Sequence, residues 1–470
     1  MRPRTAALLG AAAGLALPAL APGVASAHGL VGRADLPIPS WLFGWAAAIV
    51  LAASFAALAS LWPKPRLQHV EERRFLRLPR WIDLVCGAIG IAIFAAVVYS
   101  GFAGIQESAR NLAPTAIYVI FWVGLVVLSL LFGDVFRAFN PWRSAAIAVS
   151  WLARRFGYER RVRPYPERLG RWPAVIGIVA FAWLELVYVH KADPDKLAAL
   201  ACAYALIQLA GMFTFGIEPW SRSADAFGVY FNLFSRLSIF ERRDHVVYVR
   251  PPLSGAPMWP VIPGSAALLC VAIGSTSFDG FSNGPVWASL NPHLQSFFKD
   301  IGFGTNGALM AAGTVGLAIG ITVISSFYVL GIQGMKTVGR GHDARELLGR
   351  FAHTLIPIAF AYALAHYFSL LAYQGQAVGY LVSDPLGHGS NIFGTAHATI
   401  DYGIIAGAGI WYVQVGALIA GHVSGLVLAH DRALAMYPNV KDAARSQYWM
   451  LVVMVGFTSL GLWLLSAVNT

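Results

Sequence analysis

Long apolar runs alternate with polar segments along this chain. Ten runs are long enough for a helix to cross the hydrocarbon core of a membrane, which takes about 20 residues. They lie at roughly 41–62, 81–103, 114–133, 173–190, 197–217, 259–276, 303–332, 353–373, 404–430 and 447–467. In lipid such runs must be helical, because an open extended segment leaves its backbone hydrogen bonds unsatisfied. The pattern predicts an all-α polytopic bundle of about ten transmembrane helices.

Lysine and arginine are concentrated in alternate loops. The basic loops are 63–80, 134–172, 218–258, 333–352 and 431–446, and the loops poor in Lys and Arg are 104–113, 191–196, 277–302 and 374–403. Because basic loops stay in the cytoplasm, we predict a multi-pass protein of the inner (cytoplasmic) membrane with both mature termini outside. Within the basic loops, 141–156 and 226–240 mix large apolar residues with arginine, which favours helices lying in the membrane interface.

The N-terminus has the three-part build of a signal peptide. Arg2 and Arg4 precede an apolar stretch, and small residues close it at Ala27. We therefore divide the chain into a signal peptide, 1–27, and a single transmembrane domain, 28–470. Cleavage would make His28 the new N-terminus, where its amine and imidazole together can bind a metal such as copper. The alternative is that His28 merely follows a convenient cleavage site.

The amino-acid composition limits which binding partners are expected. Hydrophobic residues make up 57% of the chain and charged residues 12%, so the lipid bilayer is the expected surroundings. The net charge of +11 comes from the alternate loops and not from one basic surface, so no nucleic-acid partner is expected. The three cysteines lie in apolar runs without CxxC spacing, which argues against a disulfide framework or a thiolate metal site.

Ionisable residues at membrane depth are the main functional candidates, because each is costly to place there. Those that fall in or at the ends of the apolar runs are Asp83, Asp134, Glu185, His353, His366, Asp401 and His422. Asp134 and Arg137 are three residues apart and are expected to pair on one helical face. Glu185 has no basic neighbour in sequence, so it is protonated, paired across helices or functional.

Histidines gather near the outer face of the C-terminal half. His366 lies in the outer half of its helix, and His388, His397 and Asp401 follow in the next outside loop. Such a set fits a divalent metal, zinc or copper, with an open water position. No HExxH motif fixes the spacing, so the alternative is a hydrogen-bonded loop that happens to hold histidines. Asp279, in the preceding outside loop, either joins this site as ligand or general base or caps backbone amides.

The positions of the histidines along their helices argue against a haem site. Histidines on separate membrane helices can ligate haem iron, and His353, His366, His422 and His430 are such residues. They do not form two pairs at matched depth, because His422 lies about 12 Å from its helix's inner end and His366 about 20 Å out from His353. For His430 and its neighbours Asp431 and Arg432, the favoured interpretation is an ordinary helix end at the headgroups.

Several sequence blocks resemble a known family. They are HGLVGRADLPIPSW, LFGDVFRAFNPWR, FAWLELVY, SFDGFS, AHYFSLLAYQGQ, SDPLGHGSNIFGTAHATIDYG and GHVSGLVLAHDRAL. Together they resemble the actinobacterial-type membrane proteins that carry the name fenitrothion hydrolase, over nearly the whole mature chain. The resemblance implies a membrane hydrolase that cleaves the P–O bond of lipophilic organophosphorus triesters. It supplies no catalytic signature that maps residue by residue.

Two functions follow as expectations. In the hydrolase, a metal held by His366, His388, His397 and Asp401 activates water, with Asp401, Asp279 and His366 as the catalytic candidates. In the alternative, a transporter or metal-handling permease, Glu185, His366 and His422 are stations along a path. His28 is then a capture ligand at the mouth.

Overall fold

The computed structural model describes residues 40–467, except 69, 159–160 and 339–341. All ten predicted runs are helical over most of their length. They are α2 (Ser40–Leu61), α3 (Trp81–Ala103), α4 (Leu112–Thr115) continued by η3 (Ala116–Gly124) and α5 (Leu125–Phe132), α8 (Trp172–Leu186), α9 (Pro194–Phe215), α12 (Ser265–Ser282), α14 (Thr305–Lys336), α16 (Ile356–Gln374), α18 (Gly407–Met436) and α20 (Tyr448–Ala467). The predicted signal peptide and His28 lie outside the described residues.

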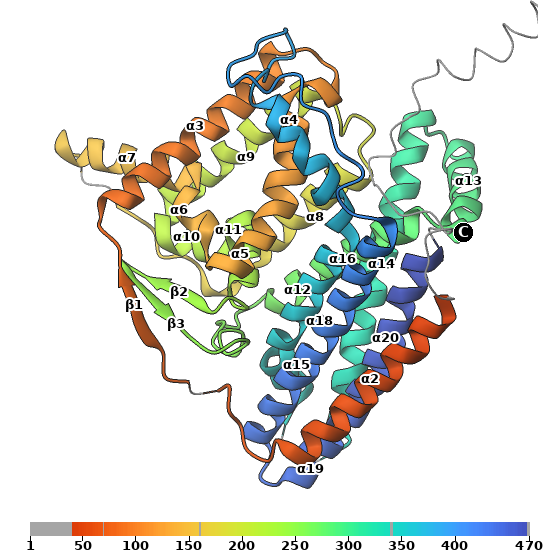
Figure 1. Ribbon diagram of the computed structural model, residues 1–470. Helices are drawn as coiled ribbons and strands as arrows, with labels where there is room; N and C mark the ends of the chain where they lie inside the picture. Colours follow the sequence, from red (N-terminus) through yellow and green to blue (C-terminus); the bar gives the residue numbers. More distant parts are fainter. Residues whose placement is uncertain (1–39, 69, 159–160, 339–341, 468–470) are drawn as a thin grey trace, which may run out of the picture.

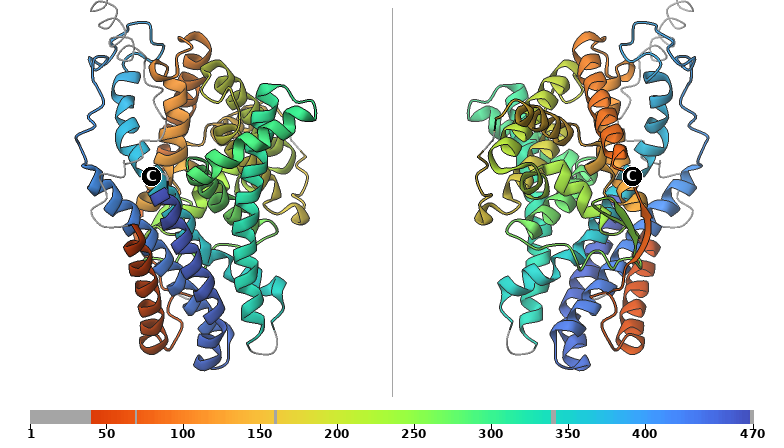
Figure 2. Two further views of the ribbon diagram at one scale, coloured as in Figure 1. Left: turned by 90° about the vertical axis from the view of Figure 1, so that its right-hand side faces the viewer. Right: turned by 90° about the vertical axis from the view of Figure 1, so that its left-hand side faces the viewer.

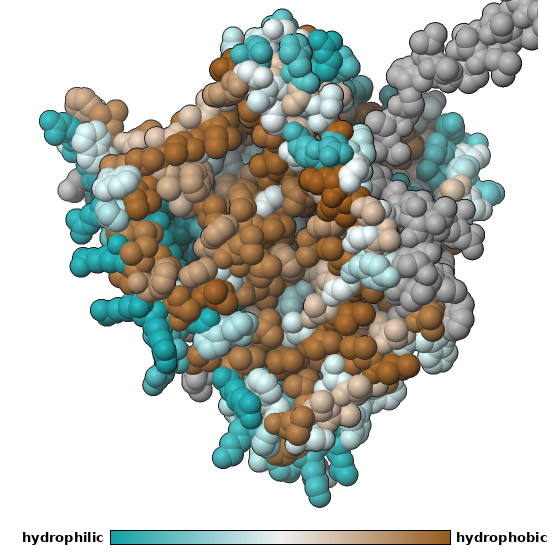
Figure 3. Space-filling model, viewed as in Figure 1, coloured by the Kyte–Doolittle hydropathy of each residue, from teal (hydrophilic) through white to brown (hydrophobic). Residues whose placement is uncertain are grey.

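The membrane prediction is confirmed at the level of fold. Within the described residues, eight helical segments are long and apolar enough to cross a membrane, and α2 and α20 are not among these eight. Apolar residues cover most of the face seen in Figure 3, and hydrophilic side chains gather toward its edges. The protein is therefore an all-α polytopic bundle whose main surroundings are lipid.

The first and last helices pack together. In Figure 1, α2 runs beside α20 and α18, far from the next helix in sequence, α3. The helices α12, α14, α16, α18 and α20 form the rest of this group, and the views in Figure 2 show it standing beside the group built from residues 81–235. Helices α8 and α11 (Ala226–Ser235) contact α12 and α16 across the boundary.

Short elements lie between these helices. They are η2 (Ser108–Arg110), α6 (Val135–Phe139), α7 (Pro141–Arg155), η4 (Glu167–Leu169), α10 (Ile217–Ser223), α13 (Pro285–Asp300), α15 (Ala344–Phe351), η5 (Ala352–Leu355), η6 (Gly375–Ala377), α17 (Val378–Leu381) and α19 (Val440–Ser446). The α7 helix has exposed Ile147, Trp151 and Leu152, as an interfacial helix requires.

The prediction that 226–240 lies in the interface is wrong. Eight of the ten residues of α11 are buried, and Phe227 and Phe231 pack against Phe121 of η3 with ring centroids 4.7 and 5.2 Å away. Asp225, just before α11, is also buried and accepts hydrogen bonds from Trp142 Nε1 at 2.7 Å and Tyr204 Oη at 2.8 Å. Aromatic packing and this buried acceptor make α11 a core helix.

Contacts between loops follow the charge pattern. Strand β1 (Arg73–Arg77), from one basic loop, pairs antiparallel with β3 (Val246–Val249) of another, and β2 (Phe240–Arg243) completes a sheet of order β1-β3-β2. Two loops poor in Lys and Arg also meet, since Ile105 N donates to Leu386 O at 2.9 Å. In both contacts a loop meets another loop of its own charge class, as the charge pattern predicts. Which group faces the cytoplasm stays a prediction.

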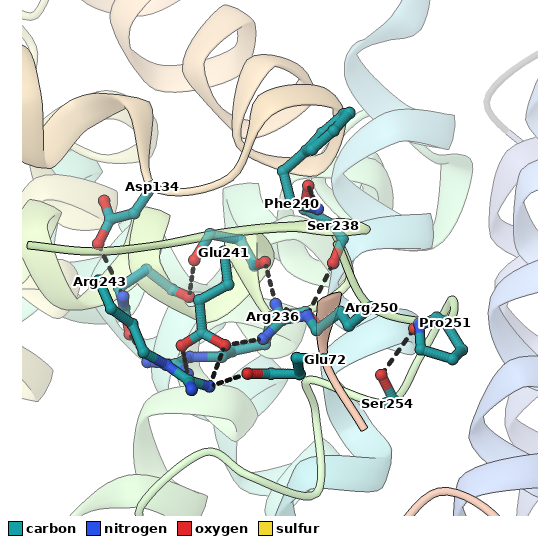
Figure 4. Close-up of polar contacts among 12 residues, drawn as sticks. Glu72, Asp134, Arg236, Ser238, Phe240, Glu241, Arg243, Arg250, Pro251 and Ser254 are labelled. Atoms are coloured by element: carbon teal, nitrogen blue, oxygen red, sulfur yellow. Dashed lines mark hydrogen bonds and ion pairs between the residues drawn. The ribbon is translucent and has the colours of Figure 1, made fainter. Parts of the chain in front are cut away.

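A charge network holds the sheet to the end of α11. Figure 4 shows Glu241 surrounded by guanidinium groups: Arg250 at 2.6 Å, Arg243 at 2.9 Å and Arg236 at 3.2 Å. Arg243 also reaches Glu72 at 2.6 Å. The Arg250 side chain is only 1% exposed, and buried charges persist where they are paired and hydrogen-bonded. The sequence predicts only that these arginines keep their loops in the cytoplasm. In the structure they also join loop 218–258 to loop 63–80.

Candidate functional site

Four buried polar residues from three helices meet toward the C-terminal ends of α8 and α12. They are Glu185 near the end of α8, Asp279 in the last turn of α12, and His366 and Tyr367 in the middle of α16. Each is at most 8% exposed. The prediction that Asp279 lies in a loop is wrong, because α12 continues to Ser282 past the polar residues Ser275, Thr276 and Ser277. Their hydroxyls bond back to carbonyls of the same helix, which lets the helix extend.

Asp279 is the centre of this cluster. Its Oδ2 lies 2.8 Å from His366 Nε2 and accepts a hydrogen bond from Tyr367 Oη at 2.9 Å. Two donors on one oxygen offset the cost of burying a carboxylate. The same contact fixes the orientation of the imidazole, as a carboxylate does in an acid–histidine catalytic pair. The sequence leaves open whether Asp279 joins the site of His366 or caps backbone amides, and the structure brings the two side chains together.

Glu185 faces the pair from α8. Its carboxylate lies close enough to Asp279 for the two charges to interact, and Tyr367 lies against both carboxylates. Lys191, just beyond the end of α8, is the nearest cation that acts on Glu185. Carboxylates and imidazoles are groups that bind and release protons, and three of them lie together here. Glu185, Asp279 and His366 together can therefore store and transfer protons.

An aromatic wall closes the site on the side of η3. This nine-residue segment is a π-helix, in which Tyr118 and Trp122 lie on nearly the same face. Trp122 stacks on Tyr230 of α11 with ring centroids 4.6 Å apart and planes at 11°, and Tyr118 Oη donates to Lys191 O at 2.8 Å. Tyr118 and Tyr230 both lie within the electrostatic reach of Glu185. π-Helical segments occur frequently at functional sites, and nothing in this run of apolar residues signals one.

The residues predicted in the loop after α17 do not join this cluster. His388, His397 and Asp401 are exposed. Asp401 Oδ1 accepts from Gly403 N at 2.8 Å, and Asp401 N donates to Gln376 Oε1 at 3.0 Å, so its polar groups shape the loop. Among the described residues, no group of three or more His, Cys, Asp or Glu side chains is spaced to hold a metal ion. The metal site stays a prediction.

The remaining candidates lie elsewhere. His422 of α18 is fully buried, its Nδ1 lies 2.7 Å from Leu418 O, and His353 is buried in η5. The predicted side-chain pairing of Asp134 with Arg137 is wrong. Asp134 instead caps α6, accepting from Arg137 N at 3.2 Å, because the Arg137 guanidinium pairs with Glu218 at 2.8 Å.

One important carboxylate was misinterpreted from the sequence. Asp431 is not at a solvated helix end but fully buried. It accepts hydrogen bonds from Trp62 Nε1 at 3.1 Å, Leu67 N at 3.1 Å and Gln68 Nε2 at 2.7 Å. These donors lie more than 360 residues away in the chain, so no local pattern could show them.

Comparison with known proteins leaves the site to be interpreted from its own geometry. No protein-family model, no curated protein and no solved structure matches this chain. The fold and the site define a polytopic helical membrane protein with a buried acid–histidine cluster.

Proposed function

We propose that this protein is a membrane hydrolase of lipophilic organophosphorus triesters in which Asp279 and His366 act together as general base. The observation that carries the proposal is the buried 2.8 Å contact between Asp279 Oδ2 and His366 Nε2. The sequence resemblance described above supports the substrate class, and the depth of the site supports a substrate that partitions into lipid.

The reaction follows from these groups. The Asp279–His366 pair takes one proton from water, and the hydroxide adds to phosphorus. The P–O bond to the aryl group then breaks, and the departing aryl oxide takes the proton back from the pair. Tyr367 orients the Asp279 carboxylate through its hydrogen bond. Tyr118, Trp122 and Tyr230 supply apolar surface on the side of Glu185.

Hydrolysis of fenitrothion or paraoxon by isolated membranes tests the proposal. Membranes with the wild-type protein should release nitrophenol above the rate of empty-vector membranes. His366→Ala and Asp279→Asn should each lower that rate about 100-fold or more, the usual contribution of a general base. His293→Ala is the matched control, since His293 is exposed on α13. A wild-type rate equal to the empty vector contradicts the hydrolase proposal for these substrates.

The sequence-predicted metal site is tested alongside. Asp401 is a ligand in the predicted metal site but has no part in the Asp279–His366 mechanism. The rate of Asp401→Ala therefore distinguishes the two mechanisms. A loss as large as that of His366→Ala, together with a rate that a chelator abolishes and Zn²⁺ restores, would support the metal-assisted mechanism instead.

A further inference from the structure

The interface between α16 and α18 is the longest close contact of the C-terminal helices. The two helices lie side by side (Figure 1) and run antiparallel. A Cβ on Gly421 would lie 2.3 Å from Ala361 Cβ, and one on Gly425 would lie 3.1 Å from Thr354 O. This register places Gln414 at about the depth of His366, and His422 about two turns further toward η5.

Polar side chains recur along this tightly packed interface. Gln414, His422 and His353 are at most 2% exposed. Within the described part of the chain, Gln414 Nε2 and His422 Nε2 have no hydrogen-bond partner. Each such atom costs roughly 1–3 kcal/mol, and native proteins pair nearly all of them. Ionisable groups kept at this depth usually belong to an ion or proton route.

The spacing of these groups suits proton transfer. His366 and Tyr362 are one helical turn apart, about 6 Å, and the Tyr362 and His422 ring centroids are 6.0 Å apart. A further turn along α18 reaches Gly425, which abuts Thr354, the neighbour of His353. Gaps of this size are bridged by single water molecules, and the unpaired nitrogens are suitable donors and acceptors for them.

The series spans most of a bilayer. From His353 to His366 is about 20 Å along the helix axis, against a hydrocarbon core of about 30 Å. At the η5 end lie Arg432, whose charge acts on His353, and the exposed Arg350. At the other end, Asp279 and Glu185 continue from His366 toward Lys191.

We propose that these residues form a proton path through the membrane, so that the protein conducts protons between the η5 end of α16 and the Glu185 end. In each step one proton moves from one group to the next, where a group is a ring nitrogen, a hydroxyl or a bridging water. The group that gave up its proton takes another from the preceding group in the path. Nothing is oxidised or reduced, and the membrane potential drives the flow. This activity requires no triester and does not rest on the proposed hydrolysis.

Proton flux into proteoliposomes tests the path. Purified protein is reconstituted with pyranine inside, and valinomycin with a potassium gradient makes the interior negative. We expect wild-type vesicles to acidify at least five times faster than protein-free vesicles. His422→Phe keeps the ring contacts with Tyr362 and Phe457 but cannot carry a proton, so it should return the rate to the protein-free value. Gln414→Leu should do the same.

Controls separate conduction from folding and from hydrolysis. His293→Ala, outside the interface, should conduct like wild type, and a thermal unfolding curve checks that each variant is folded. His422→Phe should still hydrolyse triesters if both proposals hold. The proton path is overturned if wild type acidifies no faster than protein-free vesicles. It is equally overturned if folded His422→Phe and Gln414→Leu both conduct like wild type. If His422→Phe does not fold, Gln414→Leu decides alone.

Discussion

One carboxylate oxygen of Asp279, Oδ2, contacts both the His366 imidazole and the Tyr367 hydroxyl. In the proposed mechanism the two contacts have different roles: His366 forms the general base together with Asp279, and the Tyr367 hydroxyl, which donates to Asp279 Oδ2, orients the carboxylate. The distinction matters because a positioning residue should affect rate and pH dependence without abolishing the reaction.

Replacement of Tyr367 by phenylalanine tests this role. The change removes one hydrogen bond to a charged group, worth about 1.5–3 kcal/mol, so we expect triester hydrolysis to fall roughly 10- to 100-fold. The ring and its packing remain. Rates measured across pH should show a displaced profile as well as a lower maximum. An unchanged rate and profile would show that Tyr367 does not orient Asp279.

Asp431 is a structural carboxylate, and its removal should affect stability. Asp431→Asn keeps the size of the side chain but replaces one acceptor oxygen with a donor, which must face either Trp62 Nε1 or the pair Leu67 N and Gln68 Nε2. We expect a loss of about 1–3 kcal/mol in unfolding free energy, seen as a lower Tm in detergent. Asp300→Asn, on the exposed end of α13, should leave Tm unchanged. A normal Tm for Asp431→Asn would show that these bonds contribute nothing net.

At the scale of elements, glycine controls how closely helices approach. Gly421 lets α18 touch α16, since a Cβ there would also lie 2.8 Å from Pro357 O. We expect Gly421→Ala to force the helices apart and lower Tm by several degrees, because the contacted atoms are backbone and Cβ and cannot move alone. Gly416→Ala, on the same helix with nothing within 4 Å, is the control. Equal Tm values for the two variants would contradict the close contact.

At the same scale, Glu218 of α10 joins elements through charge. Burial opposes its ionisation, but Arg137 and Arg143 hold the pKa of this carboxyl below its usual range. A depressed folded-state pKa contributes stability that is present above the unfolded pKa, near 4.5, and is lost as the pH falls through the folded pKa. We expect Tm to fall on acidification below about pH 4.5 and to fall less steeply in Glu218→Gln. Parallel pH curves for the two proteins would exclude this contribution.

At the scale of the whole molecule, the loops form two groups, and the charges predict which is inside. In a variant without its three native cysteines, Ser390→Cys and Arg155→Cys place one exposed thiol in each group. We expect a membrane-impermeant maleimide to label Ser390→Cys in intact spheroplasts, and Arg155→Cys only after permeabilisation, because arginine-rich loops are retained inside. The reverse labelling would invert the topology while leaving the fold unchanged.

The sequence alone predicts the membrane helices and the grouping of the loops. These are local properties: a run of about 20 apolar residues must satisfy its backbone bonds as a helix, and charge acts on each loop separately. It also singles out Glu185, His366 and His422, because ionisable residues stand out in apolar runs, whereas Asp279 is a candidate in an expected loop.

Only the tertiary structure decides which of these residues meet. Asp279 and His366 are 87 residues apart in the chain, and their contact depends on how α12 crosses α16. The same holds for Asp431 and its distant donors, for the strand pairing of two loops, and for the burial of α11. These contacts depend on packing between segments that are distant in the chain. The residue pattern of one segment does not show which other segment it packs against.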